Sequence, residues 1–220
     1  MLDVEEYMHS IVKALQDCFA DRLLYVGLQG SYLRGEATEH SDIDVVVILD
    51  DLSARDLTAY KEIISGLASP EKSCGFICGR EELRNWNPLE ICNFLYGTKN
   101  HYGKLAELLP PFTRGDVENF ARLSVGNLYH EICHRYVHAT PEKNKSKLPY
   151  AYKNVFFILQ SLYYLKTNVF YPTKRELLPN LSREDKEMMD RAARLLQEDF
   201  DFNEEFSALL TWCQEILRSL

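Results

Sequence analysis

The stretch Gly30–Leu49 reads GSYLRGEATEHSDIDVVVIL and decides the fold of this chain, because it joins a glycine-serine turn to a strand that begins with two aspartates. Side chains two residues apart on a strand point to the same face, so Asp42 and Asp44 point the same way. Two carboxylates beside an anion-binding turn are what a magnesium-bound nucleoside triphosphate requires. The stretch therefore predicts a site for such a nucleotide.

The residues around the turn also suit a phosphate. Leu23–Leu28 is a short apolar run typical of a buried strand, and the turn that follows it can open a helix. Free amides at a helix start attract anions, Gly30 lets the backbone approach a phosphate closely, and the Ser31 hydroxyl can donate to a phosphate oxygen. Gly35 lets the chain leave the short helix at positive φ. With a magnesium ion on the aspartate pair, the arrangement supports in-line displacement at the α-phosphorus with release of pyrophosphate.

The pattern Gly-Ser-x-x-x-Gly, a short spacer and Ser-Asp-x-Asp resembles the signature of the DNA polymerase β superfamily of nucleotidyltransferases. The glycine-serine element and the Asp-x-Asp element are each common on their own. The alternative interpretation is a β-turn followed by a surface aspartate pair. Within the superfamily, the small bacterial antibiotic nucleotidyltransferases are most similar, because they pair such a domain with a C-terminal helical bundle. The resemblance implies a magnesium-dependent enzyme in which Asp42 and Asp44 hold the catalytic metal and Gly30 and Ser31 bind the nucleotide.

Composition and charge favour a small acceptor. The chain has 220 residues, 46% of them hydrophobic, which is enough for one good core or two small ones. A polymerase or RNA-tailing enzyme needs a basic track for the phosphate backbone, whereas this chain has a net charge of −8 and shows no such track. An acidic surface suits a cationic or neutral small molecule better, so no nucleic-acid partner is expected.

The cysteines and the N-terminus indicate a cytoplasmic protein. The six cysteines are scattered with no C-x-x-C spacing, and the first residues lack the basic stretch and apolar run of a signal peptide. Free thiols are therefore expected. No apolar run approaches the roughly 20 residues that span a bilayer, so no membrane partner is expected. The cysteines are Cys18, Cys74, Cys78, Cys92, Cys133 and Cys213.

The first half of the chain predicts a small α/β (α+β) domain with a mixed sheet. Apolar residues recur at helical spacing over Val4–Phe19 and again over Leu57–Leu67, where Ser53 is a candidate N-cap. Ser73–Cys78 predicts a third strand, and Leu89–Tyr96 predicts a short helix. Helices and strands in this order form a layered nucleotidyltransferase domain over residues 1–112.

The second half, residues 113–220, predicts an antiparallel helical bundle. The segment Leu109–Gly115 interrupts all regular structure and is the best domain boundary. The helices that follow have short connections, which favours antiparallel neighbours. The aromatic-rich run Tyr152–Lys174 also resembles the helical domain of the antibiotic enzymes. Helices are expected at residues 116–138, 150–167, 182–197 and 203–217.

Lys143, Lys145, Lys147 and Lys153 form the densest basic cluster of this acidic chain. Lys143 and Lys145 are interpreted as part of a solvated loop. Lys153 lies early in the aromatic-rich helix, and the resemblance implies that it holds the triphosphate. Arg34 is a second candidate for a phosphate contact; its alternative is a surface position on a one-turn helix.

The sequence lacks an acidic residue at the position where the superfamily usually has a third one. Members of the superfamily usually carry an acid on the strand after the aspartate pair, as a metal ligand or as general base for the acceptor hydroxyl. Here that strand, Ser73–Gly79, has none. Among the later acids Glu81, Glu82 and Glu90, the last is expected to face inward from the start of an apolar helix and to be a relocated catalytic base. The alternatives are a first-turn acid favoured by the helix dipole, or an acceptor that needs little base assistance.

His130–His134 reads H-E-I-C-H, which on a helix puts two imidazoles on one face with Glu131 beside them. Zinc metalloproteases use this arrangement, but no recognisable third-ligand motif follows. We interpret the pattern as a face of the bundle, and Mg²⁺ is the cofactor that the sequence predicts.

The sequence and its resemblance favour an enzyme that transfers a nucleoside monophosphate, with AMP from ATP preferred, to a hydroxyl of a small molecule such as an aminoglycoside-like antibiotic. One alternative is nucleotidylation of a protein partner, as in the minimal nucleotidyltransferases of toxin–antitoxin pairs. Another is a non-catalytic nucleotide-binding module, which the missing third acid favours.

Overall fold

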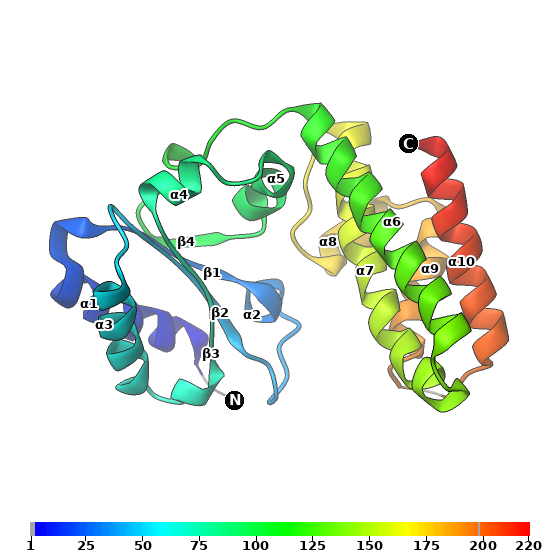
Figure 1. The fold of residues 1–220 in the computed structure, drawn as a ribbon, viewed down its shortest axis with the longest axis horizontal. Helices are drawn as coiled ribbons and strands as arrows, with labels where there is room; N and C mark the ends of the chain where they lie inside the picture. Colours follow the sequence, from blue (N-terminus) through cyan, green and yellow to red (C-terminus); the bar gives the residue numbers. More distant parts are fainter. Residues whose placement is uncertain (1–2, 198) are drawn as a thin grey trace. The chain divides into compact units, whose positions relative to one another are not determined.

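The computed structural model describes residues 3–197 and 199–220, and the chain divides into two compact units between Phe112 and Thr113 (Figure 1). In the first unit the helices are α1 (Val4–Phe19), α2 (Gly30–Arg34), α3 (Ala54–Ser65), α4 (Arg80–Arg84) and α5 (Pro88–Tyr96), and the strands are β1 (Leu23–Gln29), β2 (Ile43–Leu49), β3 (Ser73–Gly79) and β4 (Lys99–Tyr102). In the second unit the helices are α6 (Arg114–His138), α7 (Pro141–Thr167), α8 (Lys174–Leu177), α9 (Arg183–Arg194) and α10 (Phe202–Ser219).

The first unit is built on a mixed sheet of four strands in the described residues, in the order β3-β2-β1-β4. β1 is antiparallel to β2 and to β4, whereas β2 and β3 are parallel. The small mixed sheet predicted from the sequence is confirmed. β4 was not predicted, because its sequence KNHY has no apolar alternation and only its pairing with β1 makes it a strand. The Tyr25 hydroxyl on β1 donates to Asn100 Oδ1 on β4 at 2.7 Å and helps to fix this edge.

Helices cover both faces of the sheet (Figure 1). One face packs its buried side chains, among them Val45 and Val47, against α1 and α3. The other face packs Val46 and Ile48 with residues of α4 and α5. Because side chains alternate along a strand, Asp44 shares the face of Val46, which is the face that α4 and α5 cover.

α3 begins where the sequence predicts. Ser53 and Asp56 form a capping box, in which each side chain bonds to the backbone N–H of the other residue. Arg22 donates to both carboxylate oxygens of Asp56 at 2.9 Å and ties this helix start to the turn between α1 and β1. The bidentate pair lowers the pKa of Asp56, so the cap stays charged.

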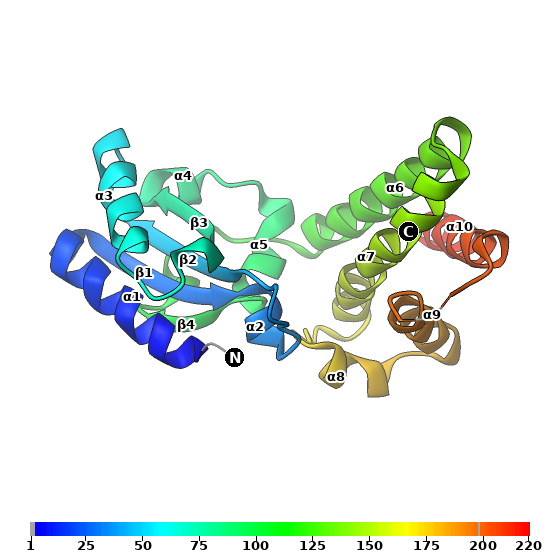
Figure 2. The same cartoon turned by 90° about the horizontal axis from the view of Figure 1, so that it is seen from below.

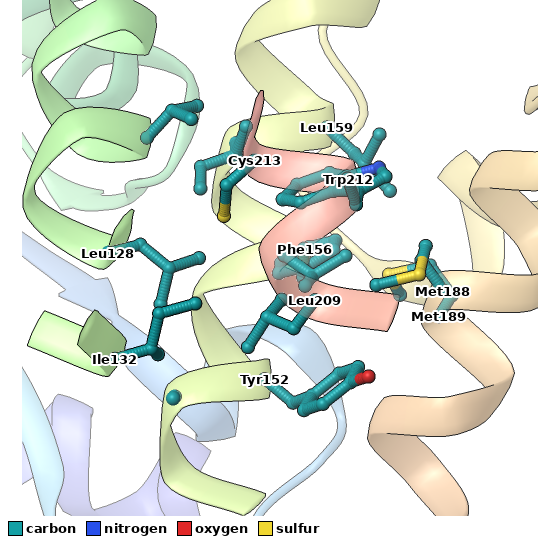
Figure 3. Packing of buried hydrophobic residues seen from close by; sticks show 14 of the residues in the cluster. Leu128, Ile132, Tyr152, Phe156, Leu159, Met188, Met189, Leu209, Trp212 and Cys213 are labelled. Carbon is teal, nitrogen blue, oxygen red and sulfur yellow. The ribbon is translucent and has the colours of Figure 1, made fainter. Parts of the chain in front are cut away.

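The second unit is the predicted helical bundle. α6 packs against α7 and α10, and α7 packs against α9 (Figure 2). All four helices contribute to one buried cluster (Figure 3). Its members include Leu128 and Ile132 from α6, Tyr152, Phe156 and Leu159 from α7, Met188 and Met189 from α9, and Leu209, Trp212 and Cys213 from α10. None of the helices in the described ranges is both long enough and apolar enough to cross a bilayer.

α7 starts nine residues before its predicted start at Tyr150. Thr140 caps it, Pro141 occupies its first turn, and Pro149 lies inside it. The expected loop around Lys143 and Lys145 is therefore wrong. The first two turns of α7 are largely exposed and charged, so they lack the apolar periodicity that reveals a helix.

Candidate active site

The glycine-serine turn joins β1 directly to α2. Gly30 has a φ of +72°, which favours glycine, and a Cβ atom placed on it would lie 1.7 Å from Oδ2 of Asp44. Any side chain at position 30 would therefore displace the carboxylate. Gly35 caps the end of α2, and its φ of +67° lets its N–H donate back to the carbonyls of Ser31 and Tyr32. The turn and the second aspartate are thus packed together, as the sequence predicts.

The two aspartates lie at the start of β2. Asp44 is half-buried and pairs with Gln29, the residue just before Gly30, across the antiparallel β1–β2 ladder. Asp42 immediately precedes the strand and is exposed. Burial is the main cause that raises the pKa of Asp44, and the Asp42 carboxylate raises it further. The repulsion between the two carboxylates is what a divalent cation bound to both would relieve.

Two neighbouring groups oppose this rise. The Arg34 guanidinium lowers the pKa of Asp44 by its charge, and a hydrogen bond with the Cys74 thiol lowers it as well. Arg34 also pairs with Glu36 at 3.2 Å, and both side chains are largely buried. Arg34 therefore acts on the electrostatics of the aspartate pair and is more than a surface residue of a short helix.

Polar residues form a row across this end of the sheet. Cys74 on β3 is the register partner of Asp44, and Gln29 on β1 is its partner on the other side. Gln29 Nε2 donates to Thr98 Oγ1 at 2.7 Å, and Thr98 in turn donates to the Phe94 carbonyl at the end of α5. Sequence reasoning missed Gln29 and Cys74 as site residues. The signal available for Gln29 was its position directly before the turn.

Glu90 is exposed, so the expectation that it faces inward is wrong. It lies in the first turn of α5, whose buried side is formed by Ile91 and Cys92. Its Oε2 accepts a hydrogen bond from Trp86 Nε1 at 2.5 Å. The Trp86 ring packs edge-on against Phe76 at a centroid distance of 5.0 Å.

Phe76 follows Cys74 by two residues and packs in the cluster of Val46 and Ile48. Glu90 is therefore held, through Trp86, over the sheet face that carries Asp44. Its role as general base remains a proposal. Two other acids that could serve as the base are paired with arginines: Glu81 with Arg84 at 2.6 Å, and Glu131 of the helical unit with Arg135 at 2.7 Å.

Lys153 belongs to the second unit. Its neighbour Tyr152 is fully buried and donates to the Glu205 carbonyl at 2.8 Å, which fixes the rotation of α7 so that Lys153 lies on the exposed side. The Lys153 ammonium lies 5.0 Å from the centroid of the exposed Tyr150 ring, and that of Lys147 lies 5.1 Å from the same centroid. Lys153 is thus a solvent-facing cation, and its triphosphate contact belongs to the proposal below.

The histidine pattern lies on the exposed side of α6. The ring centroids of His130 and His134 are 5.8 Å apart, and those of His134 and His138 are 4.7 Å apart. Over residues 3–197 and 199–220, no group of three or more His, Cys, Asp and Glu side chains is arranged to hold a metal ion. The aspartate pair supplies two hard oxygen ligands, and Mg²⁺ takes its remaining ligands from substrate phosphates and water, so these residues fit a Mg²⁺–nucleotide.

Comparison with known proteins places this geometry in a family. Residues 10–85 match the family model described as a nucleotidyltransferase domain. The candidate protein adenylyltransferase MJ0604 of Methanocaldococcus jannaschii is 31% identical over 78 residues, which are 32% of this chain and 78% of that protein. The candidate protein adenylyltransferase MJ1379 of the same organism is 35% identical over 65 residues, which are 30% of this chain and 63% of that protein.

One solved structure shares the fold of both halves. It is the spectinomycin adenyltransferase AAD(9) from Enterococcus faecialis with ATP and spectinomycin, and the match covers 97% of this chain and 99% of that one with a TM-score of 0.58. The sequence identity is 15%, so this similarity shows a shared fold alone. The matched domain contains the turn at Gly30 and the Asp42–Asp44 pair, and the chain belongs to the nucleotidyltransferase-domain family.

Proposed function

We propose that this protein transfers a nucleoside monophosphate, AMP from ATP, to a hydroxyl group of a small acceptor in a magnesium-dependent reaction. The observation that carries the proposal is the packing of the Gly30 turn against Asp44, where the backbone comes too close for any side chain. Backbone and hydroxyl donors of the turn suit the phosphates of a nucleotide. The two carboxylates beside the turn suit a cation that is also bound to those phosphates.

Each residue of the site has a role in this proposal. Asp42 and Asp44 would hold Mg²⁺, and Ser31 would donate to a phosphate oxygen. Bound there, the ion supplies positive charge that stabilises the phosphate oxygens and the pyrophosphate leaving group. Lys153 would add charge on the triphosphate, and Glu90 would accept the proton of the attacking hydroxyl.

Three observations support a small acceptor. The net charge of −8 disfavours nucleic acid and suits a cationic or neutral molecule. The two-unit fold matches, over nearly the whole chain, that of a spectinomycin adenyltransferase whose structure was solved with ATP and spectinomycin. The helical unit, which the family model does not cover, makes up the second half of the chain and is available to contribute acceptor contacts.

A protein acceptor is the second candidate. The two relatives from Methanocaldococcus jannaschii are named as protein adenylyltransferases. The same aspartate pair would then serve a side-chain hydroxyl.

The direct test is incubation of the protein with each α-labelled nucleoside triphosphate, Mg²⁺ and a panel of hydroxylated aminocyclitol and aminoglycoside antibiotics. The proposal expects pyrophosphate release together with an acceptor heavier by one nucleotidyl group, and ATP as the preferred donor. Label on protein with none on the small molecules would select the second candidate. If the protein binds nucleotide but transfers it to neither small molecules nor protein, both candidate functions are contradicted. The protein would then be a nucleotide-binding module.

Ser31→Ala is expected to weaken nucleotide binding by about 1.5–3 kcal/mol, since it removes one hydrogen bond to a charged phosphate. The transfer rate at saturating nucleotide should change much less. Titration of a non-hydrolysable ATP analogue measures the effect. Ser65→Ala is the control, because the Ser65 hydroxyl donates to the Lys61 carbonyl within α3. Equal affinities of Ser31→Ala and wild type would exclude the phosphate contact.

Lys153→Ala is expected to weaken ATP binding by roughly 1–3 kcal/mol through loss of a charge-assisted contact, and to affect AMP binding little. Lys147→Ala is a closely matched control, because Lys147 is also exposed and lies at nearly the same distance from the Tyr150 ring. If both variants lose the same affinity, the effect comes from general charge, and Lys153 has no specific place on the triphosphate.

A further inference from the structure

The strand next to the aspartate pair carries a cysteine at the site. β3 runs parallel to β2, and their register pairs Asp44 with Cys74. Register partners on adjacent strands point to the same face, and the next residue on that face, Phe76, packs with Val46 and Ile48. The Cys74 side chain therefore lies on the sheet face that carries Asp44. It is exposed, so solvent and ligands can reach it.

The residues on either side of Cys74 hold it in this place. The Ser73 hydroxyl is hydrogen-bonded to the Tyr7 hydroxyl of α1. Gly75 has a φ of +138°, and a Cβ atom on it would lie 1.9 Å from the Val45 carbonyl oxygen. β3 thus approaches β2 more closely at Gly75 than a residue with a side chain would allow. The thiol between these two anchors belongs to the register partner of Asp44, and it lowers the pKa of the Asp44 carboxyl.

We infer that Cys74 is a third residue of the nucleotide–metal site, where its thiol orients the Asp44 carboxylate and becomes covered when the nucleotide binds. The inference rests on the proposed function, since it concerns the same site. It names a positioning residue, because Cys74 acts through Asp44. The polar row across the sheet end then has a hydrogen-bonding residue on each side of the carboxylate, Cys74 on β3 and Gln29 on β1.

Alkylation of the unmodified protein tests the covering of the thiol. In this reaction the thiolate sulfur displaces iodide from iodoacetamide, a C–S bond forms, and the thiol proton passes to solvent. Cys18 on α1 is also exposed and serves as an internal control in the same sample. A Mg²⁺–ATP analogue at ten times its dissociation constant leaves about one molecule in eleven unliganded, so Cys74 should react about tenfold more slowly while Cys18 is unchanged. Peptide mass spectrometry gives both rates.

Two results separate this inference from the proposed function. Analogue binding detected by titration, with an unchanged rate at Cys74, would overturn the inference and leave the proposed function intact. Absence of any nucleotide binding would overturn the proposed function and the inference with it.

Substitutions test the orientation of Asp44. Cys74→Ala should raise the Mg²⁺ concentration for half-maximal analogue binding by about threefold to tenfold, because it removes a weak donor to a charged group. Cys74→Ser should restore the wild-type value, and Cys18→Ala should not change it. Melting temperatures should stay similar, since position 74 is exposed. A Cys74→Ala protein with wild-type Mg²⁺ dependence, or a serine variant no better than alanine, would refute the positioning role.

Discussion

Asp44→Asn and Asp42→Asn are each expected to lower nucleotidyl transfer by about 1,000-fold or more, because each removes one of the two carboxylates that we propose as metal ligands, worth several kcal/mol in the transition state. Neither change should unfold the protein, since both side chains lie at the strand start and outside the buried cluster of β2. Circular dichroism and pyrophosphate release would be measured together. Asp51→Asn is the control, because its exposed side chain follows the other end of the same strand. Unchanged turnover in either variant would end the metal assignment.

Asp44→Asn should also raise the melting temperature of the metal-free protein at pH 7. Burial and the Asp42 carboxylate raise the pKa of Asp44 in the folded state. A carboxyl group with a raised folded-state pKa contributes stability at low pH, and that contribution is lost as the pH rises through the folded-state value. The advantage of the asparagine variant should therefore shrink as the pH is lowered and Asp44 becomes protonated. A variant less stable than wild type at pH 7 would contradict this electrostatic account.

Glu90→Gln is expected to slow transfer by about 100- to 10,000-fold if Glu90 is the general base, with nucleotide affinity nearly unchanged. Glu107→Gln is the control, because Glu107 is an exposed acid of the same unit that pairs with Lys104. Trp86→Phe keeps a ring against Phe76 but removes the N–H that binds Glu90. It should give a smaller loss in the same direction. If Glu90→Gln turns over like wild type, Glu90 is only a helix-start residue, and Glu81, Glu82 and, in the helical unit, Glu131 become the next candidates.

The sequence alone predicted those features of the fold that depend on neighbouring residues of the chain. The motif at Gly30 combines a glycine, a serine and an aspartate pair followed by an apolar strand, and the structure packs Gly30, at positive φ, against Asp44. The cap at Ser53 was predictable for the same reason, because a capping box is a local interaction. Both halves of the chain were correctly assigned to an α/β layer and a helical bundle.

Other features depend on pairing and exposure, which a single sequence does not reveal. β4 exists only through its ladder with β1. The start of α7 carries charged, exposed residues and an internal Pro149, so its periodicity is hidden. Glu90 lies on the outer side of α5 because Ile91 and Cys92 take the buried side. The place of Cys74 beside Asp44 follows from the parallel register of β2 and β3, which composition and spacing do not determine.

We propose that Asp42 and Asp44 hold a cation that they share with a nucleoside triphosphate. The most direct measurement is a calorimetric titration of a non-hydrolysable ATP analogue into wild type and Asp44→Asn, each with Mg²⁺ and with a chelator. We expect wild type to bind the analogue much more tightly with Mg²⁺ than with the chelator, and this difference should disappear in Asp44→Asn. Equal affinity of wild type with and without Mg²⁺, or a full Mg²⁺ effect in Asp44→Asn, would contradict it.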